Sequence, residues 1–182
     1  MEAETLAVGH ESSRAAAQVQ CCEIFREVFV VSYPRLVVQL YAVTGDAAEA
    51  EDLVQEAFVR AAAAGRRFTK LDNPEAWLRT VAVNIHRSRW RKRRNFSRIR
   101  DRVAARPTDL PALEDRLDVI EALRGLPAGQ REAVALHYLA DLDVAEVART
   151  LRISEGTVKS RLSRGREALA LAMSDIEGSD HV

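Results

Sequence analysis

Apolar residues recur at intervals of three and four along nearly the whole chain, and no stretch sustains an alternation of apolar and polar residues. Intervals of three and four place side chains on one face of an α-helix, whereas a half-buried strand requires alternation. The pattern therefore predicts an all-α protein. Because 47% of the 182 residues are hydrophobic, the chain can fill one ordinary core or two small ones.

The first expected helix runs from about Cys21 to Val43. Gly45 ends it, because glycine readily adopts the left-handed conformation that terminates helices, and Pro34 kinks or breaks it. Its expected inward residues are Phe25, Val28, Phe29, Leu36, Val37 and Leu40.

Capping residues mark the starts of the next two helices. Asp46 can cap a second helix that continues into the alanines at 61–64. After a loop, Asn73 and Pro74 form an N-cap and first-turn pair that opens a third helix. The expected inward residues of this third helix are Trp77, Val81 and Ile85.

A helix-turn-helix pattern lies in "DVAEVARTLRISEGTVKSRLSRGREAL", residues 143–169. A short amphipathic helix is followed by a tight turn at Arg152 and Ile153, and Ser154 can cap a second helix. In such a unit the first helix braces the second, whose opposite face enters a major groove. The alternative interpretation is an ordinary helical hairpin with a solvated basic face. The expected inward residues are Val144, Val147, Ala148 and Leu151 in the first helix, and Val158, Leu162 and Leu169 in the second.

Charge is balanced overall, with 27 basic and 27 acidic residues, but it is segregated along the chain. Residues 46–56 carry acids and no base, whereas residues 87–106 are almost purely basic, and residues 149–166 are basic again. Two separate basic surfaces indicate a polyanion that is contacted twice, and the acidic segment indicates a protein partner.

The expected organisation is two helical domains joined by a flexible linker, with the helix-turn-helix in the C-terminal domain. The segment "RPTDLP" is polar and contains prolines, which is typical of a linker. The expected boundaries are a disordered tail over 1–20, a first domain over 21–98, a linker over 99–114, a second domain over 115–173 and a tail over 174–182.

Three segments resemble bacterial RNA polymerase sigma factors of the extracytoplasmic-function (ECF) group. Residues 126–169 resemble their promoter-reading C-terminal domain, called region 4, and residues 46–61 and 73–94 resemble their N-terminal domain, called region 2. The resemblance implies a chain that binds core RNA polymerase and promoter DNA and directs transcription initiation. It also implies an anti-sigma factor as a further partner.

The resemblance gives the acidic segment a docking role on the largest subunit of the polymerase. The alternative is a helix N-terminus enriched in acids because of the helix dipole. The residues implied in core-polymerase binding are Glu51, Asp52, Gln55 and Glu56.

The resemblance also divides the promoter contacts between the two domains. Basic side chains beyond the core of the third helix are expected to lie along phosphates, and amide or flat groups are expected to hold single-stranded bases. Trp77 could stack on a base, although its spacing favours the core. The residues implied at the minus-ten element are Phe68, Asn73, Asn84, His86, Arg87, Arg91, Arg93 and Arg94. Those implied at the minus-thirty-five element are Ser154, Gly156, Thr157, Lys159, Ser160, Ser163 and Arg164.

Some positions depart from the family pattern. Arg152 stands where a small residue is common, Ser88 where an aspartate is frequent, and alanines at 62–64 replace bulky aromatic residues. These departures leave the shape of the turn and of the loop open.

Other classes of function find little support. There is no phosphate-binding glycine loop, no nucleophile-base arrangement and no metal-ligand spacing, so we expect no enzyme, no cofactor, no metal and no small-molecule substrate. No targeting or membrane-spanning segment is visible, so we expect a cytoplasmic protein without membrane insertion, with Cys21 and Cys22 reduced. The remaining alternative is a stand-alone helix-turn-helix regulator with an N-terminal dimerisation or sensor domain.

Overall fold

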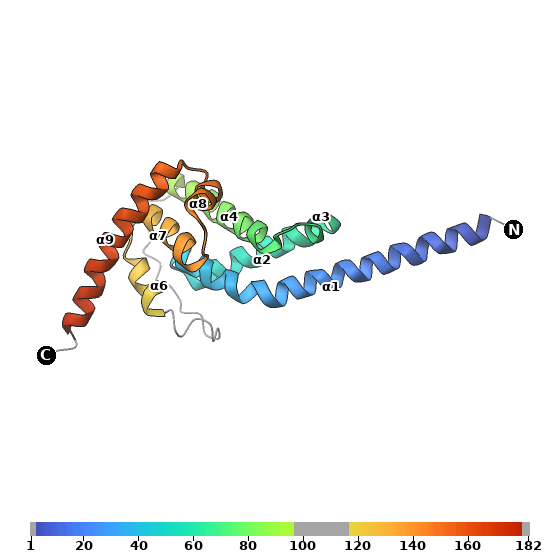
Figure 1. Ribbon diagram of the computed structural model, residues 1–182, viewed down its shortest axis with the longest axis horizontal. Helices are drawn as coiled ribbons and strands as arrows, with labels where there is room; N and C mark the ends of the chain where they lie inside the picture. The colour runs from blue at the N-terminus through green and yellow to red at the C-terminus, as the bar shows by residue number, and fades with distance from the viewer. Residues whose placement is uncertain (1–2, 97–116, 180–182) are drawn as a thin grey trace.

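The computed structural model describes residues 3–96 and 117–179, and it places side chains over 19–93 and 119–172. Within these ranges every regular element is a helix, which confirms the all-α prediction (Figure 1). The expected linker at 99–114 lies outside the described residues.

Helix α1 spans Ala3–Thr44 and is much longer than expected. It covers the part of the expected tail at 3–20 that the structure describes, because alanine, glutamate, glutamine and arginine there are good helix formers that extend an already packed helix. Pro34 lies inside the helix without ending it, and α1 bends in the half that contains this residue (Figure 1). Phe29, expected to face inward, has 41% of its surface exposed.

The expected caps position the next helices. Gly45 has a φ of 75° and separates α1 from α2, which spans Ala47–Ala64 and is capped by the Asp46 carboxylate. A short helix α3, Arg66–Thr69, then leads to α4, Pro74–Phe96. The Asn73 side chain accepts a hydrogen bond from the backbone N–H of Ala76, which confirms it as the N-cap of α4.

The C-terminal half contains α6 (Leu117–Arg124), α7 (Ala128–Val134), the π-helical turn η1 (Ala135–Leu139), α8 (Val144–Leu151) and α9 (Glu155–Ser179). A capping box starts α8, since Asp143 and Glu146 exchange side-chain-to-backbone hydrogen bonds. Helix α9 continues past residue 173, where the second domain was expected to end.

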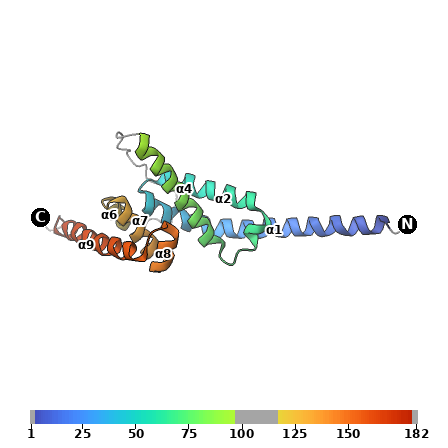
Figure 2. The same cartoon turned by 90° about the horizontal axis from the view of Figure 1, so that it is seen from above.

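The buried residues of both halves form one continuous apolar cluster. Every residue from Leu36 to Val43 is buried, because this end of α1 packs against α2 and α4 as well as against α6, α7 and η1. Helix α4 also contacts α8. Figure 2 shows the two halves side by side, with the N-terminal part of α1 extending away from both.

Candidate nucleic-acid and protein interfaces

Helices α8 and α9 form the expected helix-turn-helix. Val147, Leu151 and Val158 are fully buried and Leu162 is 6% exposed, so the two helices brace each other through the predicted apolar faces. Arg152 closes α8 in the left-handed conformation, with a φ of 50° and a ψ of 51°. The backbone N–H of the next residue donates to the carbonyl of Ala148, as in a Schellman motif.

The outer face of α9 presents small and basic side chains to solvent. Thr157 donates its backbone N–H to the Ser154 hydroxyl, which confirms the predicted N-cap. The Ser163 hydroxyl is half-buried and donates to Glu167. The remaining predicted reading residues are exposed: Ser154, Gly156, Thr157, Lys159, Ser160 and Arg164. A helix with this face can enter a major groove, where basic groups reach base edges or phosphates.

The acidic face of α2 contains exposed and engaged residues. Asp52 and Gln55 are exposed, and Glu51 is half-buried. The carboxylate of Glu56 accepts from Arg60 at 2.5 Å and from Arg89 at 2.6 Å. Burial acts to raise the pKa of Glu56, but these two arginines lower it below its ordinary value. Asp52 and Gln55 are therefore the members of the set most available to a protein partner.

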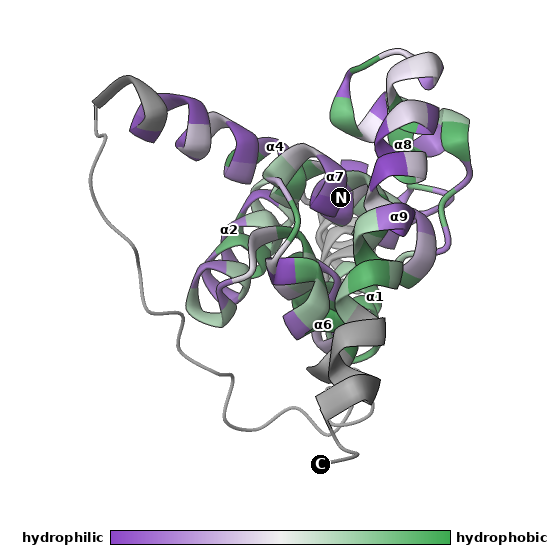
Figure 3. Ribbon diagram, turned by 90° about the vertical axis from the view of Figure 1, so that its left-hand side faces the viewer, coloured by the Kyte–Doolittle hydropathy of each residue, from purple (hydrophilic) through white to green (hydrophobic). Residues whose placement is uncertain are grey.

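Helix α4 carries its arginines past the core, and its hydrophilic end projects away from the other helices (Figure 3). Three of the arginines lie close to carboxylates of other helices. Arg89 reaches Glu56 of α2, and Arg87 lies 3.9 Å from Glu132 of α7. The third is Arg93, which contacts Glu49 at 2.5 Å. Arg91 is exposed, and the side chain of Arg94 lies outside the described ones.

His86, one of the residues implied at the minus-ten element, is buried rather than exposed. It is 5% exposed, and its Nδ1 lies 3.2 Å from Oε1 of Glu49. Burial acts to raise the pKa of Glu49, but the hydrogen bonds with His86 and Arg93 prevail and lower it to about 2. The imidazole therefore joins α4 to α2 rather than facing DNA.

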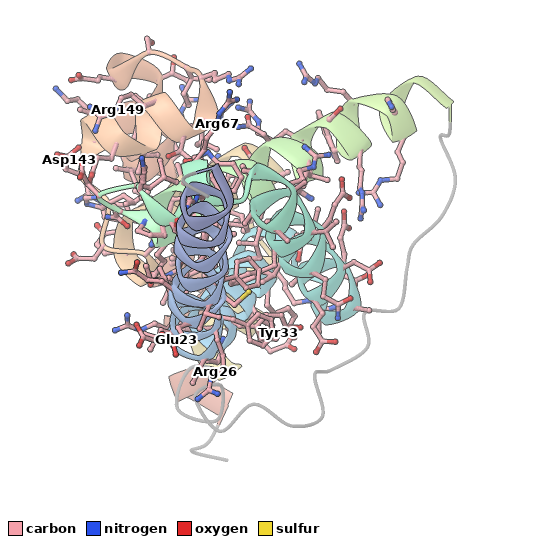
Figure 4. The ribbon with its side chains drawn as sticks, turned by 90° about the vertical axis from the view of Figure 1, so that its right-hand side faces the viewer. Glu23, Arg26, Tyr33, Arg67, Asp143 and Arg149 are labelled. Carbon is pink, nitrogen blue, oxygen red and sulfur yellow. The ribbon has the colours of Figure 1, made fainter. Side chains whose placement is uncertain are left out.

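Phe68 is likewise a core residue rather than a surface for bases. It is 1% exposed, and its ring lies 5.9 Å from Phe25 and 5.5 Å from Trp77, both edge-on. Trp77 packs against the apolar cluster, which confirms the core position that its spacing favours. Phe58, Phe29 and Tyr33 extend this aromatic cluster between α2 and α1, and Figure 4 shows Tyr33 on the side of α1 that faces α2.

The two asparagines of the predicted minus-ten site lie at different places. Asn73 is exposed at the start of α4, whereas Asn84 is half-buried and lines a hollow between α4 and α2. Sequence reasoning missed this hollow, although the spacing of four between Asn84, Ser88 and Lys92 places them on one face. The remaining lining residues are Glu56, Arg60, Ile85 and Arg89.

No helix among the described residues is both long enough and apolar enough to span a bilayer. Nor do the described residues bring together three or more histidine, cysteine or acidic side chains in a way that could hold a metal ion.

Comparisons with known proteins match both halves of the chain. The family "Sigma-70 region 2" matches residues 29–96, and "Sigma-70, region 4" matches residues 116–169. The ECF RNA polymerase sigma factor SigL of Mycobacterium tuberculosis is 37% identical over 140 residues, which cover 73% of this chain and 79% of SigL. SigW of Bacillus subtilis is 28% identical over 170 residues, covering 85% of this chain and 91% of SigW.

A solved structure shares the arrangement of helices. The sigma factor RpoE from Bartonella quintana, in complex with the anti-sigma factor NepR, superposes with a TM-score of 0.66 and 30% identity, over 82% of this chain and 96% of RpoE. Two sigma-70 regions in this order define an RNA polymerase sigma factor. Within that class, the chain belongs to the ECF sigma factors, which act in promoter recognition and transcription initiation.

Proposed function

We propose that α9 reads the minus-thirty-five element, that α4 and the loop before it bind the minus-ten element, and that α2 docks on core RNA polymerase. The observation that carries this assignment is the face of α9, which is capped by Ser154, braced by α8, and exposed at Lys159 and Arg164. The stand-alone regulator is not favoured, because region 2 and region 4 both match.

The test compares footprints with and without polymerase. Overproducing the chain and mapping the new transcript starts identifies its promoters, and DNase I protection on one of them is then measured. We expect protection of both promoter elements with core polymerase, and none by the chain alone at the same concentration. A palindromic footprint from the chain alone would instead support the stand-alone regulator.

The docking face has its own test. Asp52→Arg combined with Gln55→Arg places positive charges on an exposed face, so it should leave the fold intact and weaken core-polymerase binding by tenfold or more, because mismatched charge at an interface is costly. Glu23→Arg, on the outer side of α1, is the matched control (Figure 4). Equal affinity of the double variant and the control for core polymerase would remove the docking role from α2.

We further infer an anti-sigma partner, because the RpoE structure that the chain resembles contains the anti-sigma factor NepR. We infer action in the cytoplasm, where RNA polymerase works, and no catalysed reaction of its own. A purification from cells that carry a tagged chain tests the partner. Besides polymerase subunits, we expect one protein whose addition suppresses the footprint, and failure of every co-purified protein to do so would remove the inference.

A further inference from the structure

The two halves of the molecule meet around the C-terminal turns of α1. Helix α1 contacts α2 and α4 of its own half, and it contacts α6, α7 and η1 of the other half. Every residue from Leu36 to Val43 is buried. A helix with apolar side chains on all sides is stable only when it is covered on all sides, so the C-terminal half completes the burial of α1.

Arg131 of α7 caps this end of α1. Its Nε donates to the carbonyl of Val43 at 3.0 Å, and its Nη2 donates to that of Thr44 at 3.3 Å. The last turn of α1 contains no basic residue of its own. The guanidinium of Arg131 therefore satisfies terminal carbonyls and places a positive charge at the negative end of the helix dipole.

The approach of the two halves is close at this point. Gly45 follows the capped carbonyls with a φ of 75°, and a Cβ there would lie 3.3 Å from Cγ of Arg124 in α6. Nη1 of Arg131 donates to the carbonyls of Arg124 and Leu126 and so ties the same guanidinium to its own half. One side chain thus joins the end of α1 to the turn between α6 and α7.

Glu132, the next residue, adds a second connection. It is 8% exposed, and its Oε2 lies 3.9 Å from Nε of Arg87 in α4 and 3.8 Å from Nη1 of Arg161 in α9. These arginines come from the two helices to which we assign DNA binding. A carboxylate between them occupies the charges that a phosphate would otherwise take.

The closed arrangement does not fit simultaneous contact with both promoter elements. Elements centred near minus ten and minus thirty-five are about 25 base pairs apart, or about 85 Å along B-DNA. Helix α4, with 23 residues, is about 35 Å long, and α8, which braces the reading helix, contacts it directly. The two reading surfaces are therefore much too close together for promoter binding.

We propose that Arg131 and Glu132, with the carbonyls of Val43 and Thr44 and the side chain of Arg87, form an interdomain latch that closes the free chain without any partner. Opening the latch uncaps α1 and releases Arg87 from Glu132, so that binding of phosphate by Arg87 favours the open form. The inference rests on the proposed DNA-binding roles of α4 and α9.

The test measures the separation of the two halves in the full chain. Spin labels are attached to the native Cys22, which is exposed on α1, and to Arg166→Cys on the exposed side of α9, in a Cys21→Ser background. Pulsed electron-electron double resonance on the free chain should give one population of distances. Addition of core polymerase and promoter DNA should convert it to a longer distance.

Arg131→Gln should raise the ratio of open to closed molecules in the free chain by about fivefold to thirtyfold, as expected for the loss of the hydrogen bonds that cap α1. Arg26→Gln, an exposed arginine on the outer side of α1, is the matched control and should leave the ratio unchanged (Figure 4). Glu132→Gln should raise the same ratio by a smaller factor. It replaces Arg131→Gln as the test of the latch if circular dichroism shows that Arg131→Gln does not fold.

Two results would overturn the latch: a free wild-type chain that is mainly open, or folded latch variants with the same open fraction as Arg26→Gln. The DNase I footprint of the same labelled chains with core polymerase, compared with that of chains with substituted basic residues in α4 or α9, separates this outcome from a failure of the DNA-binding assignment. Chains that close as described but whose footprint with polymerase does not depend on α4 or α9 would refute that assignment while leaving the latch in place.

Discussion

The arginines of α4 and the basic residues of α9 have similar sequence patterns but different surroundings. In α4, Arg89 and Arg93 contact carboxylates of α2. In α9, Lys159 and Arg164 are exposed, and no ion pair is found for either within the described residues. The denser basic run therefore offers less free charge to DNA than its sequence suggests, because part of it holds helices together.

The largest effect is expected for Glu49→Gln. This variant removes the α2 carboxylate that His86 and Arg93 of α4 both contact. We expect a loss of about 2 kcal/mol in the free energy of unfolding, since hydrogen bonds to charged groups contribute about 1.5–3 kcal/mol. Urea unfolding measures it, with the exposed Glu155→Gln as control. Equal midpoints for the two variants would show that α2 does not hold α4 through this carboxylate.

The same variant should change the dependence of stability on pH. The folded-state pKa of Glu49 is lowered from 4.5 to about 2, so its contribution is complete above 4.5 and is lost as the pH falls through about 2. Between these values the wild type should lose stability with acid more steeply than Glu49→Gln. Parallel curves for both proteins over this range would contradict the assigned shift.

Arg164→Ala tests one of the basic side chains of α9 for which no ion pair is found within the described residues. If Arg164 reaches a base edge, its loss should cost about 1–3 kcal/mol of binding at one position of the minus-thirty-five element. Binding of the holoenzyme to promoters with single substitutions in that element measures this, with the exposed Arg166→Ala as the control. An equal loss on every promoter would instead identify α9 as a phosphate clamp.

A smaller difference in DNA binding is expected between two arginines of α4. Arg91 is exposed, whereas Arg93 contacts Glu49. Arg91→Ala should weaken binding alike on all promoters and reduce the slope of log affinity against log salt by about one unit, and Arg93→Ala should reduce it less. Titrations of the holoenzyme with promoter DNA at several salt concentrations compare the two variants. The reverse order would mean that DNA displaces Glu49 from Arg93.

The sequence predicted those features that depend on neighbours within one or two helical turns. The caps at Asp46, Asn73 and Ser154 and the braced faces of α8 and α9 belong to this group. The burial of His86 and Phe68 was not predicted, because His86 meets Glu49 and Phe68 meets Phe25, each on a helix that is distant in the sequence. His86 finds Glu49 on another helix, and a polar residue near a basic run resembles a surface residue until that carboxylate is known.

The contact between the halves was also missed, although the sequence contains a signal for it. The segment "LVVQLYAV", residues 36–43, has no polar face, and its one amide, Gln39, is buried and accepts a hydrogen bond from Arg79. A helix that served one small domain would leave a polar side toward solvent. The apolar residues all round this segment therefore indicate cover from a second domain, and periodicity alone does not identify which one.

The smallest expected effect concerns the turn that orients the reading helix. Arg152 adopts a φ of 50°, which costs a residue with a Cβ about 1–2 kcal/mol relative to glycine. Arg152→Gly relieves this strain, but glycine also gains about 0.5–1 kcal/mol of entropy in the unfolded chain, so the net stabilisation should be about 0–1.5 kcal/mol. Thermal unfolding measures the change, with the exposed Arg149→Gly inside α8 as a control that should destabilise the fold.

Because Arg152 is exposed and lies outside the proposed reading face, the Arg152→Gly variant should keep its promoter preference. A loss of promoter preference in a fully folded Arg152→Gly protein would show that this arginine contacts DNA, and it would extend the unpaired basic surface of α9 into the turn.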